Sequence, residues 1–492
     1  MRFAKIIATL GPACEDIEIM RQMVQQGVDV FRLNLSHGSH AVHAKSIALI
    51  KKIQAENNHV KPAILVDLQG PKIRIGSFKN GEVFLIEGKQ FDLSLDHDIN
   101  SGTDTVVGID ESLIVSDVKI GQKLLLDDGN IMLKAIHKTD RVLSTEVLVG
   151  GTLSGKKGIN LKGGGLSTTA FTPKDQKDLI FALQHDIDFV ALSFVEKDED
   201  IIHLKSFIQS QQSGCSPSII AKIERAEAIK RINEIAEVSD GLMIARGDLA
   251  LEVGLAKVPH LQKSIIQVAK KYDCFSIVAT QMMESMIHSF TPTRAEVSDV
   301  ANANIDEADA LMLSAETSVG KYPVQVIKQM AEICKQDMLM QGEHEIFKHN
   351  IKECDTTRVL TLNGCQIAAD LLAKALVVYT EKGRTALFAS RQKIHIPIYA
   401  LSQNKMTCLK MNLLRGVSPV LVSFLNHDVA SLDVLAVRTL VDQNNIQSPD
   451  TVVILKGDLV GVSGHTNSIE VWTASDLLKF HDLSGQTKED HS

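Results

Sequence analysis

The sequence contains few cysteines, and they are not arranged in pairs. Seven cysteines are spread over 492 residues, and no two of them form a C-x-x-C motif. Structural zinc sites and redox centres use closely spaced cysteines, and small secreted proteins use many of them. The pattern therefore argues against a zinc site and a disulfide framework, and it favours a reduced, cytoplasmic protein.

Long apolar runs, aromatic residues and a surplus of positive charge are also missing. No run approaches about 18 apolar residues, and the start, MRFAKIIATLGPA, lacks the apolar stretch of a signal peptide. Aromatic residues make up 4% of the chain, so aliphatic side chains and methionine must fill its cores. The net charge of −8 argues against nucleic acid or an acidic membrane as a partner. We therefore expect neither kind of partner.

The sequence does contain a regular alternation of short apolar runs and amphipathic segments. A chain of 492 residues is expected to form about two to four domains. Amphipathic segments such as 15–27 and 258–272 lie between most of the runs, which predicts parallel strands with crossover helices. Eight such strands predict a closed (β/α)8 barrel, the TIM barrel. The predicted strands are 5–11, 29–36, 63–70, 188–194, 218–224, 241–248, 275–281 and 310–316.

The alternation is interrupted once and changes again near residue 345. The interruption contains short strands and turns and ends in a glycine-rich stretch, which predicts an inserted β-rich domain on a hinge. Beyond residue 345, a predicted helix at 363–375 and five strand-like runs indicate an α/β domain with an open sheet. These runs are 375–380, 396–402, 418–424, 451–458 and 468–473. The predicted units are a barrel domain at 1–70 and 167–345, the inserted β domain at 71–166, the C-terminal α/β domain at 346–480 and a disordered tail at 481–492.

Polar residues follow the predicted barrel strands at their C-terminal ends, where barrels of this type place their active sites. Glu224 and Asp248, on adjacent strands, predict a site for Mg²⁺ or Mn²⁺ that leaves positions for substrate oxygens. Lys222 lies two residues before Glu224 and points to the same side of its strand, where it can neutralise a transferring phosphoryl group. The other polar or glycine residues at strand ends are Arg32, Asn34, Ser36, His37, Asp67, Lys72, Arg74, Arg246, Gly247, Thr280, Ser314 and Glu316.

Each of these residues has a simpler structural explanation when it is taken alone. A single charged residue at a strand end is usually solvated or part of a structural ion pair, Ser314 and Glu316 fit a structural role, and His37 fits a local hydrogen bond. The recurrence of polar groups at the same end of six strands favours a site. In such a site the arginines clamp anionic oxygens, and Gly247 lets backbone N–H groups approach an anion.

One apparent phosphate-binding motif is rejected. Residues 150–156 fit G-x-x-x-x-G-K, but Lys157 stands where a P-loop needs Ser or Thr, and the glycine-rich residues 158–165 are a poor start for a helix. Lys157 remains a candidate contact for a nucleotide phosphate from the hinge.

Seven motifs in this order and spacing resemble the pyruvate kinase family, of the bacterial type, from residue 4 to about residue 475. They are KIIATLGPA (5–13), FRLNLSHG (31–38), AKIE (221–224), DGLMIARGDLA (240–250), VATQMMESM (278–286), PTRAEVSDVANA (292–303) and LSAETSVGKYP (313–323). The resemblance implies that the barrel at 1–70 and 167–345 is the catalytic domain, that the inserted domain at 71–166 is a mobile β-barrel lid, and that a C-terminal α/β domain follows, usually in a homotetramer. It also implies a glycolytic enzyme that transfers a phosphoryl group from phosphoenolpyruvate to ADP, giving ATP and pyruvate.

The resemblance also assigns roles to residues. It implies that Arg32 binds substrate phosphate, that Lys222 stabilises the transferring phosphoryl group and the enolate, and that Glu224 and Asp248 hold Mg²⁺. The residues implied at the substrate carboxylate are Gly247, Asp248 and Thr280, and Thr280 is also implied in proton delivery to enolpyruvate. The residues implied on the nucleotide side are Asn34 through His37, Arg74 and Lys157.

One departure from the family pattern concerns a monovalent cation. Many members bind K⁺, and Asn34, Ser36 and Asp67 match that site here, but Leu68 stands where Thr is expected and Lys72 where Glu is expected. The Lys72 ammonium can supply the charge that K⁺ otherwise brings. We therefore predict activity without K⁺.

The C-terminal domain offers a candidate second site in YTEKGRTALFASR (379–391). A strand, a loop and a helix in this order aim helix N–H groups at an anion, although a plain capped turn explains the same pattern. The resemblance favours an effector-binding site for a phosphorylated allosteric activator, such as a sugar phosphate or AMP. The candidate residues are Thr380, Lys382, Gly383, Arg384 and Thr385.

Two other functions compete with this interpretation. An aldolase-like metal enzyme that handles phosphoenolpyruvate or pyruvate would share the lysine and carboxylates but would not need the lid, Arg74 or Lys157. A catalytically silent regulatory protein would keep the fold alone, and the complete set of Arg32, Lys222, Glu224, Asp248 and Thr280 argues against it.

Overall fold

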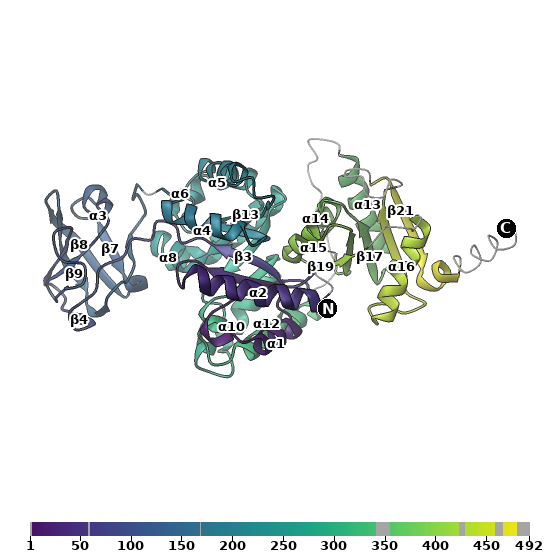
Figure 1. Ribbon diagram of the computed structural model, residues 1–492, viewed down its shortest axis with the longest axis horizontal. Helices are drawn as coiled ribbons and strands as arrows, with labels where there is room; N and C mark the ends of the chain where they lie inside the picture. Colours follow the sequence, from purple (N-terminus) through teal and green to yellow (C-terminus); the bar gives the residue numbers. More distant parts are fainter. Residues whose placement is uncertain are drawn as a thin grey trace.

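In the computed structural model the chain forms three units in a row, with the barrel between the inserted domain and the C-terminal domain (Figure 1). The structure describes residues 2–57, 60–167, 169–340, 355–392, 394–422, 429–457 and 466–479. The predicted tail at 481–492 and the predicted boundary near residue 345 lie outside these residues. Within the described part of the chain, no helix is long and apolar enough to cross a membrane.

The central unit is a closed barrel of eight parallel strands in the order β1-β16-β15-β14-β13-β12-β3-β2. This confirms the predicted TIM barrel, because each strand lies inside one of the eight predicted runs. Most of the runs extend two or three residues beyond the observed C-terminal end of the strand. The strands are β1 (Lys5–Thr9), β2 (Val30–Asn34), β3 (Ala63–Asp67), β12 (Phe189–Leu192), β13 (Ser218–Ile223), β14 (Gly241–Ala245), β15 (Phe275–Ala279) and β16 (Ala310–Leu313).

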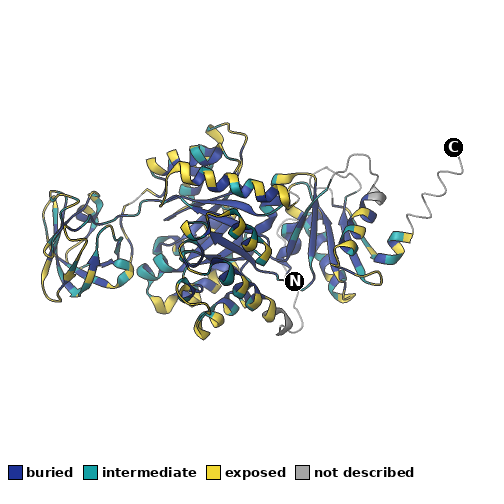
Figure 2. Cartoon of the chain, turned by 60° about the horizontal axis from the view of Figure 1, so that its bottom comes forward, coloured by how far each residue is buried: buried dark blue, intermediate teal, exposed yellow. Residues whose placement is uncertain are grey.

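Helices surround the strands and bury them almost completely (Figure 2). The two predicted amphipathic helices are confirmed, and α1 begins after Asp16, whose carboxylate accepts the backbone N–H groups of Glu18 and Ile19. The barrel helices are α1 (Ile17–Gln26), α2 (His40–Glu56), α4 (Pro173–Leu183), α5 (Asp198–Ser210), α6 (Ala226–Lys230), α7 (Ile232–Glu237), α8 (Arg246–Val253), α9 (Val258–Lys271), α10 (Arg294–Ile305), α11 (Ala315–Ser318) and α12 (Pro323–Met340). Short 3₁₀ turns occur at η1 (Pro12–Cys14), η3 (Leu255–Lys257) and η4 (Glu284–Ile287).

Four aspartates repeat around the N-terminal end of the barrel. Each one directly precedes a strand, and its carboxylate accepts the backbone N–H near the start of a neighbouring strand. These bonds join Asp29 to Ile6, Asp188 to Ile64, Asp240 to Ile219 and Asp309 to Ser276, at 2.9, 2.8, 2.7 and 2.8 Å. Such bonds satisfy N–H groups that the strand ladder leaves open, so the aspartates close the bottom edge of the barrel.

Asp188 makes the stability of the barrel depend on pH. Burial raises the pKa of Asp188 to about 7, against the opposing bond from the Ile64 N–H. The folded chain therefore holds a proton that the unfolded chain releases near pH 4, and stability falls as pH rises from about 4 to about 7. Asp188→Asn removes this loss, so above pH 7 the variant is expected to melt at a higher temperature than the wild type. The expected gain in the free energy of unfolding is at most about 4 kcal/mol.

Thermal melts between pH 4 and pH 8 check this expectation. Asp240→Asn, at an exposed position of the same repeat, is the matched control. An Asp188→Asn gain that does not grow with pH would contradict the argument.

The inserted unit is built on a six-stranded sheet, in the order β11-β7-β8-β9-β5-β6, and a two-stranded sheet of β10 and β4. Residues 151–154 of the rejected P-loop segment form β10, paired antiparallel with β4. Three consecutive glycines, Gly163 to Gly165, return the chain to the barrel with φ of 93°, 78° and 99°, a conformation that favours glycine. The elements are β4 (Glu82–Leu85), β5 (Gln90–Ser94), β6 (Val106–Gly108), α3 (Leu113–Asp117), β7 (Lys123–Leu126), η2 (Asp127–Gly129), β8 (Ile131–Lys138), β9 (Val142–Val149), β10 (Gly151–Ser154) and β11 (Ile159–Leu161).

The C-terminal unit is an open five-stranded sheet in the order β19-β18-β17-β20-β21, with β21 antiparallel. The open α/β sheet is as predicted, but the helix predicted at 363–375 is displaced, because α13 spans Thr356–Asp370. The other elements are β17 (Ala375–Tyr379), α14 (Arg384–Arg391), β18 (Ile398–Ser402), α15 (Lys405–Lys410), η5 (Met411–Leu413), β19 (Val417–Leu421), α16 (Val429–Asp442), β20 (Thr451–Lys456) and β21 (Ser468–Thr473).

The segment formed by α15 and η5, here called the floor segment, closes the bottom of the barrel. Its Leu409 and Leu413 are buried in the same apolar cluster as the inward-facing residues of the barrel strands, including Met243 and Met312. Lys410 and Asn412 of the floor segment donate hydrogen bonds to backbone carbonyls of the barrel unit. The C-terminal unit therefore completes the core of the barrel.

Candidate active site

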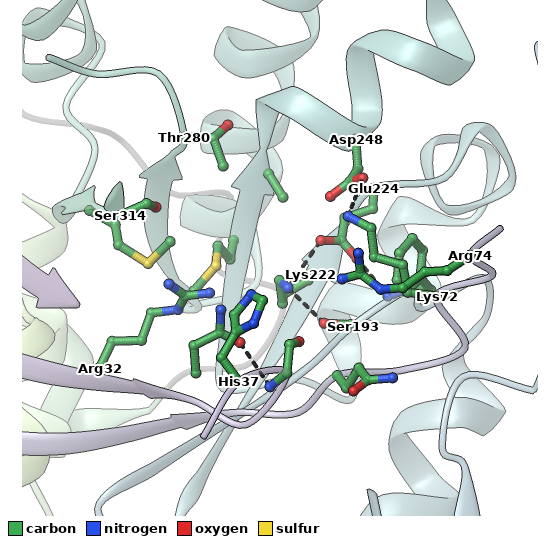
Figure 3. Close-up of a pocket in the computed structure, with 17 residues that line it drawn as sticks. Arg32, His37, Lys72, Arg74, Ser193, Lys222, Glu224, Asp248, Thr280 and Ser314 are labelled. Carbon is green, nitrogen blue, oxygen red and sulfur yellow. Dashed lines mark hydrogen bonds and ion pairs between the residues drawn. The ribbon is translucent and has the colours of Figure 1, made fainter. Parts of the chain in front are cut away.

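A cavity of about 140 Å³ opens at the C-terminal ends of the barrel strands (Figure 3). It lies at the end of the barrel opposite the floor segment and contains most of the residues that the sequence singled out. Its polar lining residues are Arg32, Asn34, Ser36, His37, Gln69, Lys72, Arg74, Ser193, Lys222, Glu224, Asp248, Thr280 and Ser314.

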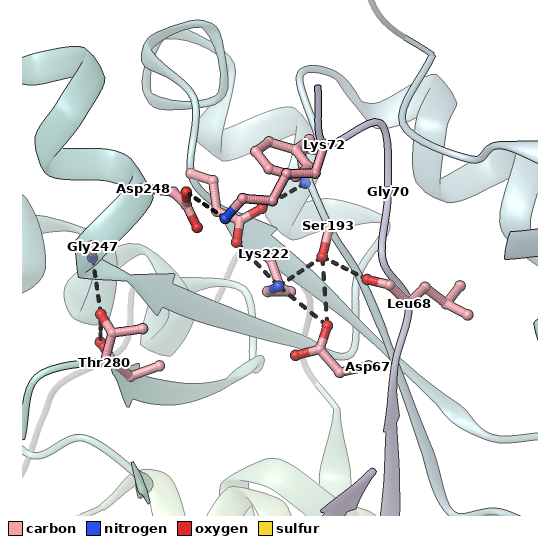
Figure 4. Close-up of polar contacts among 12 residues, drawn as sticks. Asp67, Leu68, Gly70, Lys72, Ser193, Lys222, Gly247, Asp248 and Thr280 are labelled. Atoms are coloured by element: carbon pink, nitrogen blue, oxygen red, sulfur yellow. Dashed lines mark hydrogen bonds and ion pairs between the residues drawn. The ribbon is translucent and has the colours of Figure 1, made fainter. Parts of the chain in front are cut away.

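Lys222 occupies the centre of this cavity and is surrounded by three oxygen atoms. Its Nζ lies 3.1 Å from Asp67 Oδ1, 3.1 Å from Glu224 Oε1 and 2.6 Å from Ser193 Oγ (Figure 4). The residue is 9% exposed, so its charge is held in a nearly dry environment where it acts strongly on any nearby anion.

The charges around Lys222 shift one another's protonation equilibria. Burial alone would lower the pKa of Lys222, but Asp67 and Glu224 raise it above its ordinary value. Burial would raise the pKa of Asp67, whereas Lys222 and Arg32 hold it below its ordinary value. Burial and the nearby Asp248 carboxylate raise the pKa of Glu224, against the opposing effect of Lys222. Lys222 is therefore a permanent cation at neutral pH.

Arg32 is held in place from two sides. Its Nε donates to Asp67 Oδ2 at 2.7 Å, and its Nη1 donates to Thr9 Oγ1 at 2.9 Å. Asp67 thus joins Arg32 to Lys222, so two fixed cations line the same cavity. Two such cations suit a phosphate-bearing substrate.

Thr280 adopts a backbone conformation that a β-branched residue rarely takes. Its φ is 70°, and the φ of Gln281 is 53°. Each of these conformations costs about 1–3 kcal/mol of backbone strain. Arg246, which the sequence also placed at a strand end, supports the turn because its Nη2 donates to the Thr280 carbonyl at 2.7 Å. The Thr280 hydroxyl accepts the Gly247 N–H at 2.8 Å and donates to the Ala279 carbonyl at 2.6 Å. Strain at this position points to a functional constraint on the hydroxyl.

Glu224 and Asp248 are suited to a divalent cation. Asp248 raises the pKa of Glu224, so the two carboxylates lie close enough to repel each other, and a cation would relieve this repulsion. Glu224 Oε2 is fixed by the Phe194 N–H at 2.7 Å. Among the described residues, no group of three or more His, Cys, Asp or Glu side chains is placed to hold a metal. Two carboxylate ligands fit Mg²⁺, which keeps several positions for water and substrate oxygens.

Lys72 lies beside the predicted metal ligands. Its Nζ is 3.4 Å from Asp248 Oδ1. At two of the three matching K⁺ positions the side-chain oxygens already have partners, because Asp67 contacts Arg32 and Lys222, and Asn34 Oδ1 accepts the Ser36 N–H at 3.1 Å.

The residues predicted on the nucleotide side are only partly brought together. Asn34, His37 and Arg74 line the cavity, and burial and the nearby cations Arg74, Arg32 and Lys72 lower the pKa of His37. Lys157 does not line the cavity, because its Nζ pairs with Asp127 Oδ1 at 2.6 Å within the inserted unit. Arg74 Nη1 donates to the Lys156 carbonyl at 2.9 Å, which ties it to the same part of that unit.

Sequence reasoning missed the part that Ser193 and Phe194 play at this site. Ser193 contacts Lys222, and the Phe194 N–H contacts Glu224. The only signal was their position at the end of the predicted strand 188–194. Glu316, in contrast, accepts the Ser314 N–H at 2.6 Å, which agrees with the structural role that the sequence favoured.

Of the candidate effector residues, Thr380, Lys382 and Gly383 lie between β17 and α14, and Arg384 and Thr385 are the first two residues of α14. Gly383 precedes α14 with φ of 81°, and the Arg384 guanidinium pairs with Asp355 at 2.6 Å. Thr385 is buried and its hydroxyl lies 3.1 Å from that of Thr466. Thr380 N donates to the Leu401 carbonyl at 3.0 Å.

Comparison with known proteins gives the same assignment along the whole chain. A family model described as the pyruvate kinase barrel domain matches residues 1–327, and one described as the pyruvate kinase alpha/beta domain matches residues 359–472. A pyruvate kinase of Buchnera aphidicola subsp. Acyrthosiphon pisum is 40% identical over 478 residues, which cover 96% of this chain and 98% of that protein. Pyruvate kinase II of Salmonella typhimurium is 39% identical over 484 residues, with 96% and 99% covered.

A solved structure of a pyruvate kinase from Cryptosporidium parvum has a similar fold. The TM-score is 0.87 at 29% sequence identity, and 96% of each chain is covered. Both family models and the relatives of similar length indicate the same family, and the arrangement of the cavity is consistent with it. The chain therefore belongs to the pyruvate kinase family and is a phosphotransferase.

Proposed function

We propose that this chain transfers the phosphoryl group of phosphoenolpyruvate to ADP, giving ATP and pyruvate in the last step of glycolysis. The observation that carries the proposal is the buried Lys222 ammonium, held between Asp67 and Glu224 at the centre of the cavity. Phosphoryl transfer needs positioning and charge neutralisation more than covalent chemistry by the protein, and a fixed cation in a dry site supplies both.

The other residues then have roles that follow from their positions. Arg32 binds the phosphate of the substrate, while Lys222 neutralises charge on the transferring phosphoryl group and on the enolate. Glu224 and Asp248 hold Mg²⁺ or Mn²⁺, which supplies further positive charge for the same oxygens. The substrate carboxylate is placed at Gly247, Asp248 and Thr280.

Thr280 also has a role in completing the product. Its strained turn fixes the hydroxyl between Gly247 and the carbonyl of Ala279, which supports a part in delivering a proton to the enolate. Arg74, Asn34 and His37 face ADP. Lys157 joins them when the inserted unit closes as a lid over the cavity and excludes water.

The enzyme is proposed to work without K⁺. Asp67 already neutralises two fixed cations, and Lys72 places a third cation beside Asp248. Leu68, in place of the expected Thr, offers no side-chain oxygen.

Regulation, assembly and location are also proposed. The loop from Thr380 to Thr385 binds a phosphorylated effector, supported by the strand–loop–helix arrangement and by the cations Lys382 and Arg384. The family assignment supports a homotetramer in the cytoplasm.

A coupled assay for pyruvate and ATP tests the function. Both products are expected when phosphoenolpyruvate, ADP and Mg²⁺ are present, and loss of ATP formation is expected on chelation of the metal. Pyruvate without ATP would favour the aldolase-like alternative, and neither product would favour the silent regulatory protein. The same assay at subsaturating phosphoenolpyruvate, with sugar phosphates or AMP added, tests the effector site, and no response to any of them would favour a plain capped turn.

A further inference from the structure

Two consecutive residues directly after β12, Ser193 and Phe194, hold both members of the Lys222–Glu224 pair. Ser193 Oγ lies 2.6 Å from Lys222 Nζ, and the Phe194 N–H donates to Glu224 Oε2 at 2.7 Å. Ser193 and Phe194 are 2% and 5% exposed, so these bonds are shielded from water.

The orientation of the Ser193 hydroxyl is fixed by chemistry. An ammonium group can only donate hydrogen bonds, so the serine oxygen accepts from Lys222 and its own hydrogen must point elsewhere. That hydrogen goes to the Leu68 carbonyl at 2.7 Å, since Asp67 Oδ1 is farther away at 3.5 Å. Leu68 is itself anchored, because its N–H donates to the Ala191 carbonyl at 3.0 Å. Lys222 is thus tied through one hydroxyl to the backbone of β3 and β12.

The backbone at Phe194 is strained. Its φ of 57° lies in the left-handed region, which a bulky residue seldom adopts. The Arg225 guanidinium lies over the Phe194 ring at 5.1 Å from its centroid, and this packing helps to hold the turn. The turn aims the Phe194 N–H at Glu224 and places the Ser193 hydroxyl beside Lys222.

Ser193 also differs in charge from the other two partners of Lys222. Asp67 and Glu224 are carboxylates, and a third carboxylate would cancel the positive charge that the site needs. A neutral hydroxyl accepts the third hydrogen bond of the ammonium group and leaves its positive charge available to a substrate. Because a lysine has a flexible four-carbon stem, two carboxylates alone would leave the ammonium free to move between them.

We propose that the turn formed by Ser193 and Phe194 is a positioning element, and that Ser193 is a positioning residue for Lys222 in the phosphoryl-transfer reaction. This inference rests on the proposed function. The Ser193 hydroxyl is engaged by Lys222 and by the Leu68 carbonyl, so Ser193 acts through Lys222, and its loss changes the turnover step more than substrate binding.

Steady-state kinetics of Ser193→Ala test the proposal. Because small displacements of a catalytic group cost up to about 10²-fold in rate, kcat is expected to fall roughly 10- to 100-fold. The KM for phosphoenolpyruvate is expected to stay within about threefold of the wild-type value, since Arg32 and the metal ligands remain. Ser193→Thr retains the hydroxyl and is expected to recover most of kcat.

Ser276→Ala is the matched control, because Ser276 is a fully buried serine on the barrel strand β15 whose hydroxyl contacts Asp309 instead of Lys222. It is expected to change the melting temperature but not kcat. A wild-type kcat for Ser193→Ala, or a loss shared equally by kcat and 1/KM, would overturn the inference. So would a Ser193→Thr variant that melts like the wild type but turns over like Ser193→Ala. An inactive wild type would instead overturn the proposed function.

Discussion

Lys222→Met is expected to lower kcat by about 10³-fold or more, while the protein remains folded. Methionine fills the space of the lysine stem but carries no charge, so nothing at the centre of the cavity would neutralise the transferring phosphoryl group. The KM for phosphoenolpyruvate is expected to change much less, because Arg32 keeps its bonds to Asp67 and Thr9.

The same change leaves a buried carboxylate without its cation. Lys222 lowers the pKa of Glu224, so its removal raises that pKa further and favours uptake of a proton. The measurement is the coupled assay together with a thermal melt. Lys270→Met is the control, because Lys270 is also buried in the barrel unit but pairs with Glu307 away from the cavity. If Lys222→Met kept wild-type kcat, the proposed mechanism would be wrong.

Lys72→Glu is expected to lower activity by roughly 10²-fold in buffers that contain only a bulky organic cation. The substitution replaces a cation 3.4 Å from Asp248 with a carboxylate, so two like charges would face each other beside the predicted metal site. Added K⁺ is expected to recover part of the lost activity, because it supplies the missing charge.

Rates in Na⁺, K⁺ and tetramethylammonium check this expectation for the wild type and its variants. The wild type is expected to vary by less than about twofold among the three, and Lys72→Arg, which keeps the charge, is expected to behave in the same way. Strong dependence of the wild type on K⁺ would contradict the role given to Lys72.

The barrel could be predicted from sequence because its strands are short apolar runs with helices between them. The C-terminal ends of several strands were placed too late, since an apolar run does not show where the backbone turns. Two of these turns contain Phe194 and Thr280, with φ of 57° and 70°. Phe and Thr rarely adopt positive φ, so the sequence does not predict a turn at either position. These turns belong to the site. The predicted strand ends are therefore wrong where the backbone is shaped by the cavity and not by the packing of apolar side chains.

The displaced helix α13 has a local explanation. Its first turns contain Thr356, Thr357, Val359 and Thr361, β-branched residues that weaken a helical signal, and its start depends on the Asp355 side chain accepting the Thr357 N–H. Beyond its end, the strong helix formers after Asp370 suggested continuation, but the chain turns at Leu372 with φ of 51°.

The charged residues of the site could be predicted because each lies at the end of a predicted strand or in the loop that follows it. Ser193 could not, since a single serine in an apolar run carries no chemical signature. The resemblance predicts Lys157 near ADP, and in the structure Lys157 pairs with Asp127 within the inserted unit. The position of Lys157 relative to the cavity depends on the orientation of the inserted unit. Local sequence patterns do not predict that orientation.

The floor segment has a consequence for how the protein is made. The last barrel strand, β16, ends at Leu313, but Leu409 and Leu413 are synthesised much later and are needed to cover the apolar interior from below. A nascent chain that has completed all eight strands therefore still has an open end, and the apolar residues at that end stay uncovered until the floor segment is made. A chain that stopped before Leu409 would leave this part of the barrel core exposed.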